Sequence, residues 1–114
     1  MLIVKKSQAN IVKASKSTTI LEYLMHDKHL SGAISRINGL YPEKGFAVNE
    51  ICRELAYVIS GAGELVTKDK KVLFSTGDVL FIDCSEQFCW KGNFKIFMVT
   101  SPKFTQEQHK IIAQ

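Results

Sequence analysis

The sequence of 114 residues is poor in cysteine and has no long apolar segment. Its three cysteines form no C-x-x-C pair, and an odd number does not suit the disulfide framework of a small secreted domain. The apolar residues 1–4 are followed at once by two lysines, so we expect neither a signal peptide nor a membrane span. We therefore predict a cytoplasmic protein without a membrane partner.

The sequence also lacks a concentration of charge of one sign. Lysine and arginine number 15 against 11 acidic residues, which gives a net charge of +4. The basic residues are spread along the chain, and the densest group, residues 68–71, includes Asp69 and lies between two apolar runs. Such a group is typical of a turn, so we predict solvated lysines and no nucleic-acid partner.

Repeats, low-complexity segments and linkers are absent as well. With 46% hydrophobic residues, the chain has enough apolar side chains for a core. A chain of this length buries roughly two thirds of the surface that it exposes when unfolded, so it needs no disulfide or structural metal to fold. We predict a single soluble domain over residues 1–114.

What the sequence does have is a series of short runs rich in valine, isoleucine, phenylalanine and tyrosine, which favour strands. The runs are residues 20–24, 33–37, 46–48, 55–59, 64–66, 71–74, 78–82, 88–90 and 94–99. Turn signals separate many of them, at residues 38–39, 42–45, 61–63, 67–70, 75–77 and 91–93. No internal window has a clear helical period, so the pattern predicts an all-β sandwich or barrel.

One helix is predicted, at the C-terminal end. Thr105 and Gln108 have the S/T-x-x-E/Q spacing of a capping box, in which the two side chains satisfy free backbone amides at the start of a helix. This spacing predicts a short helix from Gln106 to Ile112. It places His109 in the helix, exposed unless the helix covers the mouth of the barrel. The other two histidines, His26 and His29, are expected at the surface in a loop.

Two segments carry a resemblance to a known family. Glu54 and Gly61 have the E-x6-G spacing that ends the first cupin motif, and Gly77 opens a segment that is similar to the second. The chain is therefore identified as a small single-domain cupin, with the resemblance covering about residues 38–102. It implies a double-stranded β-helix, which is the jelly-roll barrel of the cupins.

The metal-binding histidines of the two motifs do not match. Depending on the gap that is used, the two histidine positions of the first motif fall on Ala47 and Asn49 or on Val48 and Glu50. The histidine of the second motif falls on Phe88. With one carboxylate and one amide in place of three imidazoles, the usual cupin metal site is not expected, and we predict no cofactor.

The remaining residues favour a pocket for a small organic molecule. In the cupin alignment Asn49 and Glu54 would be the polar groups of the cavity, with Ala47 beside them. Phe88 and Trp90 lie on one strand face and would form its apolar wall. We predict a metal-independent barrel that binds or senses a small polar or cationic ligand, and leave open whether it catalyses a reaction.

Two alternatives stay open at this point. Alternation along a strand would put Glu50, Cys52 and Glu54 on one face, where they could hold a divalent transition metal in a divergent cupin enzyme. The barrel could also have a structural or partner-binding role without any ligand.

The N-terminal 17 residues are polar and rich in lysine around two short apolar patches. They could form an edge strand or an arm that is exchanged with a second copy of the chain. Cupins often hide their strand edges by extending a sheet or exchanging an arm, so the resemblance implies a homodimer.

Overall fold

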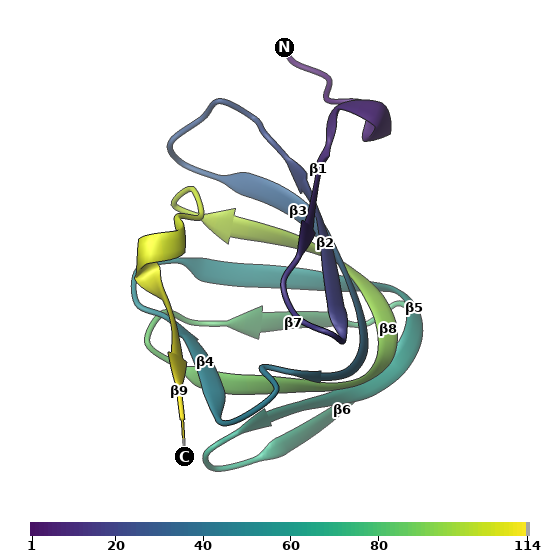
Figure 1. The fold of residues 1–114 in the computed structure, drawn as a ribbon, viewed down its shortest axis with the longest axis vertical. Helices are drawn as coiled ribbons and strands as arrows, with labels where there is room; N and C mark the ends of the chain where they lie inside the picture. Colours follow the sequence, from purple (N-terminus) through teal and green to yellow (C-terminus); the bar gives the residue numbers. More distant parts are fainter. Residues whose placement is uncertain (114) are drawn as a thin grey trace.

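The computed structural model describes residues 1–113 and consists almost entirely of antiparallel strands that belong to one curled sheet (Figure 1). The strands are β1 (Asn10–Lys13), β2 (Thr18–Tyr23), β3 (Ser31–Tyr41), β4 (Phe46–Asn49), β5 (Arg53–Thr67), β6 (Lys71–Ser75), β7 (Val79–Ile82), β8 (Gln87–Ser101) and β9 (His109–Ile112). Two short 3₁₀ turns, η1 (Lys6–Gln8) and η2 (Gln106–Gln108), complete the structure of the described residues. The predicted all-β architecture is confirmed.

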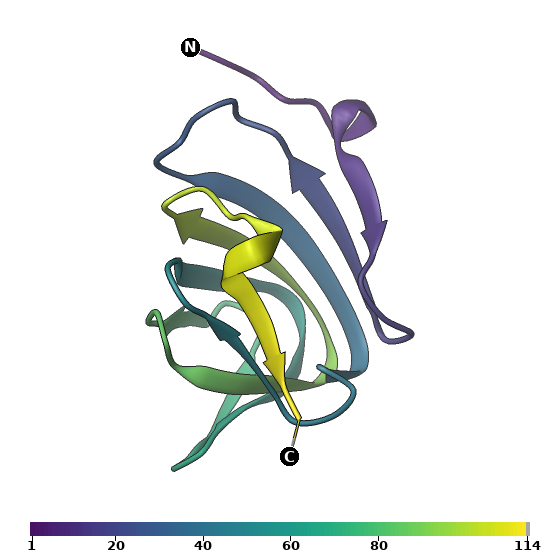
Figure 2. The same cartoon turned by 60° about the vertical axis from the view of Figure 1, so that its left-hand side comes forward.

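Strand β8 is the centre of the sheet. One of its edges pairs with β3 over eleven residues of β3 and then with β4, and its other edge pairs with nearly the whole of β5. Outside these strands, β2 and β1 extend the sheet beyond β3, β9 pairs with β4, and β6 and β7 pair with the two halves of β5. Figures 1 and 2 show that this sheet bends back on itself into an open half-barrel.

The bend runs through glycines that face one another across three strands. In the register of the sheet, Gly92 of β8 lies opposite Gly39 of β3 on one side and Gly63 of β5 on the other. A Cβ atom on Gly92 would lie 2.6 Å from the backbone oxygen of Ala62 and 2.6 Å from the Cα of Gly63. The strands can therefore approach closely enough to coil only because these side chains are absent.

The turns expected at residues 38–39, 61–63 and 91–93 are not found where this row of glycines lies. All three segments lie inside long strands and pair with one another, and β5 and β8 are each 15 residues long where the sequence predicted two shorter strands. The physical reason is that glycine permits a bend in a paired strand as readily as a reversal of the chain. The hairpin predicted over residues 67–70 is confirmed between β5 and β6.

Alternation along β5 separates the core from the outer surface. Glu54, Ala56 and Val58 are buried, whereas Leu55 and Tyr57 between them are about half exposed on the convex face. The core of the half-barrel is formed by inward side chains of this strand and its neighbours, with Phe94 and Ile96 of β8 almost completely buried. Apolar side chains are exposed on the convex face of the single chain. The homodimer stays a prediction.

The predicted C-terminal helix is wrong. Residues 106–108 form a single 3₁₀ turn, and His109 to Ile112 continue as strand β9, which pairs with β4. Thr105 makes no side-chain cap, and the Gln108 side chain is held by backbone amides of the β4–β5 connection instead. Pairing with a free strand edge thus outweighs a local capping signal. Within residues 1–113 no helix has the length and apolar character needed to cross a membrane.

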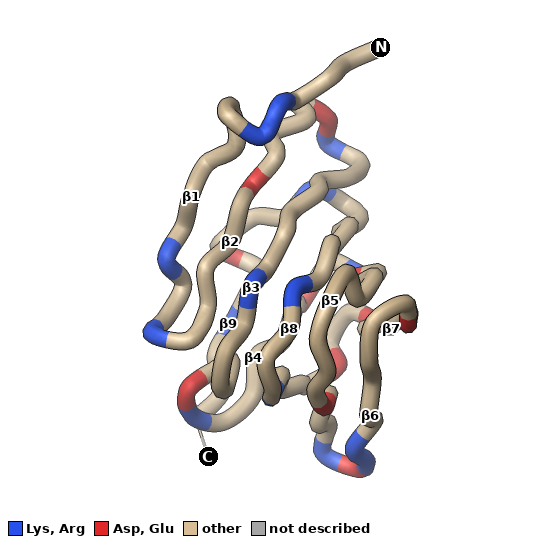
Figure 3. Tube along the Cα trace, turned by 90° about the vertical axis from the view of Figure 1, so that its right-hand side faces the viewer, with Lys and Arg blue, Asp and Glu red and all other residues tan. Residues whose placement is uncertain are grey.

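Basic side chains are less scattered in space than in the sequence. Lys13 of β1, Arg36 of β3 and Lys95 of β8 lie in one row across the sheet, with Thr19 of β2 between the first two. Together with Lys6 and other side chains they line a groove on the outer face. Figure 3 shows Lys or Arg positions, in blue, along β1, β3 and β8. Lysines distant in sequence are therefore neighbours, although the absence of a nucleic-acid partner stays a prediction.

The two motif glycines provide a matched test of the bend. Gly61 and Gly77 have nearly the same positive φ, 93° and 95°, but a Cβ on Gly61 would lie 2.2 Å from the backbone oxygen of Asn93, whereas nothing lies within 4 Å of one on Gly77. In both alanine variants the left-handed backbone conformation lowers the free energy of unfolding by about 1 kcal/mol. We expect Gly61→Ala to lose at least about 2 kcal/mol more because the paired strands must separate, as measured by urea unfolding. Equal losses would contradict this account.

Candidate functional site

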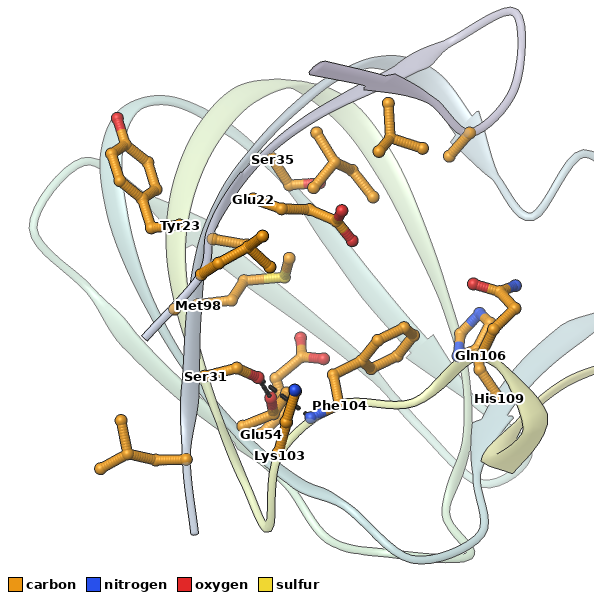
Figure 4. A pocket seen from close by; sticks show the side chains of 18 of the residues that line it. Glu22, Tyr23, Ser31, Ser35, Glu54, Met98, Lys103, Phe104, Gln106 and His109 are labelled. Carbon is orange, nitrogen blue, oxygen red and sulfur yellow. Dashed lines mark hydrogen bonds between the residues drawn. The ribbon is translucent and has the colours of Figure 1, made fainter. Parts of the chain in front are cut away.

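The concave side of the half-barrel contains a cavity of about 480 Å³. Side chains of β2, β3, β5 and β8 line it, and the C-terminal segment from Lys103 to His109 closes one side. In Figure 4 the Glu22 and Glu54 carboxyl groups point into this space from opposite sides, and the Phe104 ring lies beside it. The volume is in the range of pockets that take small organic ligands.

Strand alternation determines which side chains reach the cavity. Glu22 and every second residue before it in β2 face inward, as do Ser31, Ala33 and Ser35 in β3. At one end of β8 the inward side chains are those of Phe88 and Trp90, and at the other end they are those of Met98 and Thr100. The cavity therefore has one apolar, aromatic region and one region with hydroxyl and carboxyl groups.

Glu54 is the most unusual group in the cavity. Only 6% of the residue is exposed, and its Oε2 atom is buried without a hydrogen-bond partner. Burial raises the pKa of this carboxyl from its ordinary 4.5 to about 7, and the nearby Asn49 side chain offsets part of the increase. At neutral pH the pocket therefore holds a carboxyl group that both gives up and takes up a proton readily.

The structure places the five predicted binding residues in two groups. Glu54, Phe88 and Trp90 line the cavity, and their contact with a ligand stays a prediction. Ala47 is completely buried and pairs with Phe88 across β4 and β8, and Asn49 is buried behind the cavity wall. The aromatic rings do not fill the barrel, because the cavity lies between them and the polar groups of β2, β3 and β5.

The rival metal cluster is not assembled. Glu50 is exposed and lies in the bend between β4 and β5, so strand alternation does not extend from Glu54 back to it. The Cys52 thiol is buried and donates to the backbone oxygen of Pro102, at 3.2 Å. Among residues 1–113 no three histidine, cysteine, aspartate or glutamate side chains are grouped as metal ligands.

Tyr41 and His109, which the sequence did not predict as site residues, form a pair at the cavity. The Tyr41 hydroxyl lies 2.8 Å from Nε2 of His109, whose Nδ1 lies 2.8 Å from Oδ1 of Asn49. Burial lowers the pKa of His109, and burial together with the charge of Glu54 raises the pKa of Tyr41, so both side chains are neutral at pH 7. The sequence predicts His109 in a C-terminal helix, exposed unless that helix covers the mouth of the barrel, whereas its position in strand β9 is what brings it to the site. The two other histidines are exposed, as expected.

A second hydrogen-bond group fixes the polar end of the cavity. The hydroxyls of Ser31 and Thr100 are 2.6 Å apart, and the backbone N–H of Phe104 donates to the Ser31 oxygen at 3.0 Å (Figure 4). These contacts join β3, β8 and the C-terminal segment. They hold the Phe104 ring against the cavity, where the centroid of the ring lies 5.6 Å from the centroid of the His109 ring.

The raised pKa of Glu54 has a consequence for stability. Between pH 4.5 and about 7 the folded protein keeps a proton that the unfolded chain loses, so the free energy of unfolding falls as pH rises through this window. The loss amounts to about 3 kcal/mol above pH 7. We expect Glu54→Gln to remove this dependence and to be more stable than the wild type at pH 8 but not at pH 4, as measured by urea unfolding. The same pH profile in both proteins would contradict the burial of an unpaired carboxyl.

Comparisons of sequence find no match, neither among models of protein families nor among curated proteins. Comparisons of structure do. A structure of Streptomyces Pac13 with uridine has 12% sequence identity and a TM-score of 0.89, and the match covers 99% of this chain and 91% of that one. Pac13 is described as a nucleoside dehydratase with a β-barrel.

Two further neighbours have the same architecture. Ectoine synthase from P. lautus is 15% identical with a TM-score of 0.77, over 98% of this chain and 90% of its own. An RmlC-like cupin from Shewanella frigidimarina is 12% identical with a TM-score of 0.70, over 89% of this chain and 88% of its own. At such identities the likeness concerns the fold alone, and that fold, as the motif glycines and Glu54 predicted, is the cupin barrel.

Proposed function

We propose that this chain binds a small polar organic molecule in the cavity beside Glu54, without a metal. Glu54 is the polar anchor, and Phe88 and Trp90 form an apolar wall against which the carbon framework of the ligand packs. A concave, mostly apolar pocket with a few converging polar groups is the usual form of a small-molecule site. Asn49 and Ala47, which the sequence predicted inside the cavity, are buried behind its wall and support the site from there.

The observation that carries this proposal is the unpartnered Oε2 atom of Glu54. A buried carboxyl oxygen that lacks a hydrogen-bond partner destabilises the fold, and most buried polar groups in proteins are paired. This one lines a cavity large enough for a ligand. A ligand hydroxyl or amine that reaches the atom would supply the missing partner.

A ligand screen with a matched pair of variants tests the anchor. Glu54→Leu removes the polar group at nearly constant volume, and Glu64→Leu is its control on the same strand, since Glu64 does not line the cavity. Sugars, nucleosides, amines and small carboxylates are screened by thermal shift, starting with uridine because of the Pac13 structure, and hits are measured by calorimetry.

We expect at least one compound that binds the wild type and the Glu64→Leu variant equally but the Glu54→Leu variant at least about tenfold more weakly. The difference reflects the lost hydrogen bond to a buried carboxyl. If every hit bound the two leucine variants with equal affinity, Glu54 would not be the anchor.

The absence of a metal requirement is tested independently. The alternative set of Glu50, Cys52 and Glu54 is not gathered in one place, so no observation favours a transition-metal enzyme. Protein purified without chelator and without a histidine tag should contain less than about one tenth of an equivalent of any transition metal by elemental analysis, as expected where no three ligand side chains are grouped among residues 1–113. A near-stoichiometric metal content would overturn this part of the proposal.

A further inference from the structure

A chain of hydrogen bonds behind the cavity has a defined direction, and it begins at the backbone. The side-chain oxygen Oε1 of Gln108 lies 3.1 Å from the backbone nitrogen of Ile51 and 3.0 Å from that of Cys52. Both backbone groups are N–H donors, so the Gln108 atom that they contact must be the carbonyl oxygen. Its amide nitrogen Nε2 is then the atom that lies 3.1 Å from Asn49.

The direction passes from Gln108 to Asn49 and on to His109. Because the Gln108 amide donates, the Asn49 atom that receives it is the carbonyl oxygen Oδ1. The same oxygen lies 2.8 Å from Nδ1 of His109, and an oxygen of this kind cannot donate, so Nδ1 must carry the proton. In a neutral imidazole the other nitrogen, Nε2, then has a free lone pair.

The last link is Tyr41. Its hydroxyl lies 2.8 Å from the Nε2 atom of His109, and since that nitrogen can only accept, the Tyr41 O–H donates to it. The hydroxyl proton is therefore directed toward the strand β9, and the remaining lone pairs of the phenol oxygen are left for the cavity that Tyr41 lines. The side chains of Gln108, Asn49 and His109 thus leave the Tyr41 oxygen as a hydrogen-bond acceptor toward the cavity.

From this polarity we propose that the ligand carries two adjacent hydroxyl groups, a vicinal diol, with one hydroxyl donating to the Tyr41 oxygen and the other to the unpartnered oxygen of Glu54. This inference rests on the proposed function, because it concerns the same cavity. Tyr41 and Glu54 both line it, and they lie close enough for the charge of Glu54 to raise the pKa of Tyr41. Oε2 of Glu54 has no hydrogen-bond partner, and the Tyr41 oxygen, whose only proton is donated to His109, keeps lone pairs that can accept. A ligand that supplies two neighbouring donors completes both.

A neutral diol suits this site better than an ammonium group does. Burial keeps Glu54 partly protonated near neutral pH, so this carboxyl offers no constant negative charge to a cation bound beside it. The other glutamate of the cavity, Glu22, points in from the opposite side, away from Glu54 (Figure 4). A hydroxyl can donate to the carboxylate and accept from the carboxylic acid, so it pairs with either form. The rings of Phe88 and Trp90 offer an apolar surface to the carbon atoms of the diol.

Pairs of compounds that differ in one hydroxyl test the inference on the intact chain. They are uridine and 2′-deoxyuridine, methyl ribofuranoside and methyl 2-deoxyribofuranoside, and catechol and phenol, with choline as the cationic comparison. The fixed furanose ring ensures that the deoxy sugar has no vicinal diol. Calorimetry should show that at least one diol binds about tenfold or more tightly than its partner with one hydroxyl fewer, as expected for one hydrogen bond in a buried site. The first two pairs distinguish a nucleoside from a sugar without a base as the source of the diol.

Variants of the chain separate the role of Tyr41 from a structural one. Tyr41→Phe should reduce the ratio of affinities between each diol and its partner toward one, whereas Tyr57→Phe, on the convex face, should leave the ratio unchanged. His109→Leu should reduce it too, because the Tyr41 proton is no longer drawn away from the cavity. His109→Gln should restore it, since the side-chain oxygen of glutamine can accept the same proton. Circular dichroism and melting temperature show whether each variant is folded.

Each contrary result has a distinct meaning. If no compound distinguishes Glu54→Leu from Glu64→Leu, the proposed function fails. If compounds bind through Glu54 but no diol binds more tightly than its partner, or choline binds more tightly than every diol, the diol assignment is overturned while the function stands. An unchanged ratio in folded Tyr41→Phe and His109→Leu would overturn the role of Tyr41 as an acceptor.

Discussion

The fold depends on the close approach of three strands where Gly39, Gly92 and Gly63 lie in one row across the sheet. A sheet with ordinary side chains along this line would stay flatter, because a Cβ on the central glycine would enter the space of the neighbouring backbone. With the row in place, β5 and β8 can coil together along their full length. The half-barrel and its concave side follow from that coiling.

The bend also decides which side chains become functional groups. Along β5 and β8 every second residue turns inward, and most of these residues are apolar and pack in the core. Glu54 has the same inward position, so the alternation that buries its neighbours buries a carboxyl group as well. Its raised pKa is therefore a result of the position in the fold, since desolvation is the largest cause.

Most of the architecture could be predicted from the sequence, because β-branched and aromatic runs and the motif residues Glu54, Gly61 and Gly77 are local signals. The errors arose where pairing between distant segments decides the outcome. Residues 91–93 have the composition of a turn but continue a strand, since Gly92 pairs with a glycine of the neighbouring strand on each side. The capping-box spacing at Thr105 predicted a helix, but residues 109–112 pair with β4 instead. Because that prediction was wrong, His109 was not expected in a strand beside the cavity. Nothing local to Tyr41 or His109 shows that they meet across 68 positions of sequence.

The burial of the Glu54 carboxyl lowers the stability of the fold, and this loss bears on function. At the places where a metal cupin would have histidines, Ala47 and Phe88 pack together and Asn49 is engaged behind the cavity, so no imidazole cluster is there to share a metal with the carboxylate. The carboxyl nevertheless stays buried, at a loss of stability of about 3 kcal/mol above neutral pH. A leucine at this position would pack without that loss. Within residues 1–113 Oε2 has no hydrogen-bond partner that offsets this loss, and the proposed ligand would supply one.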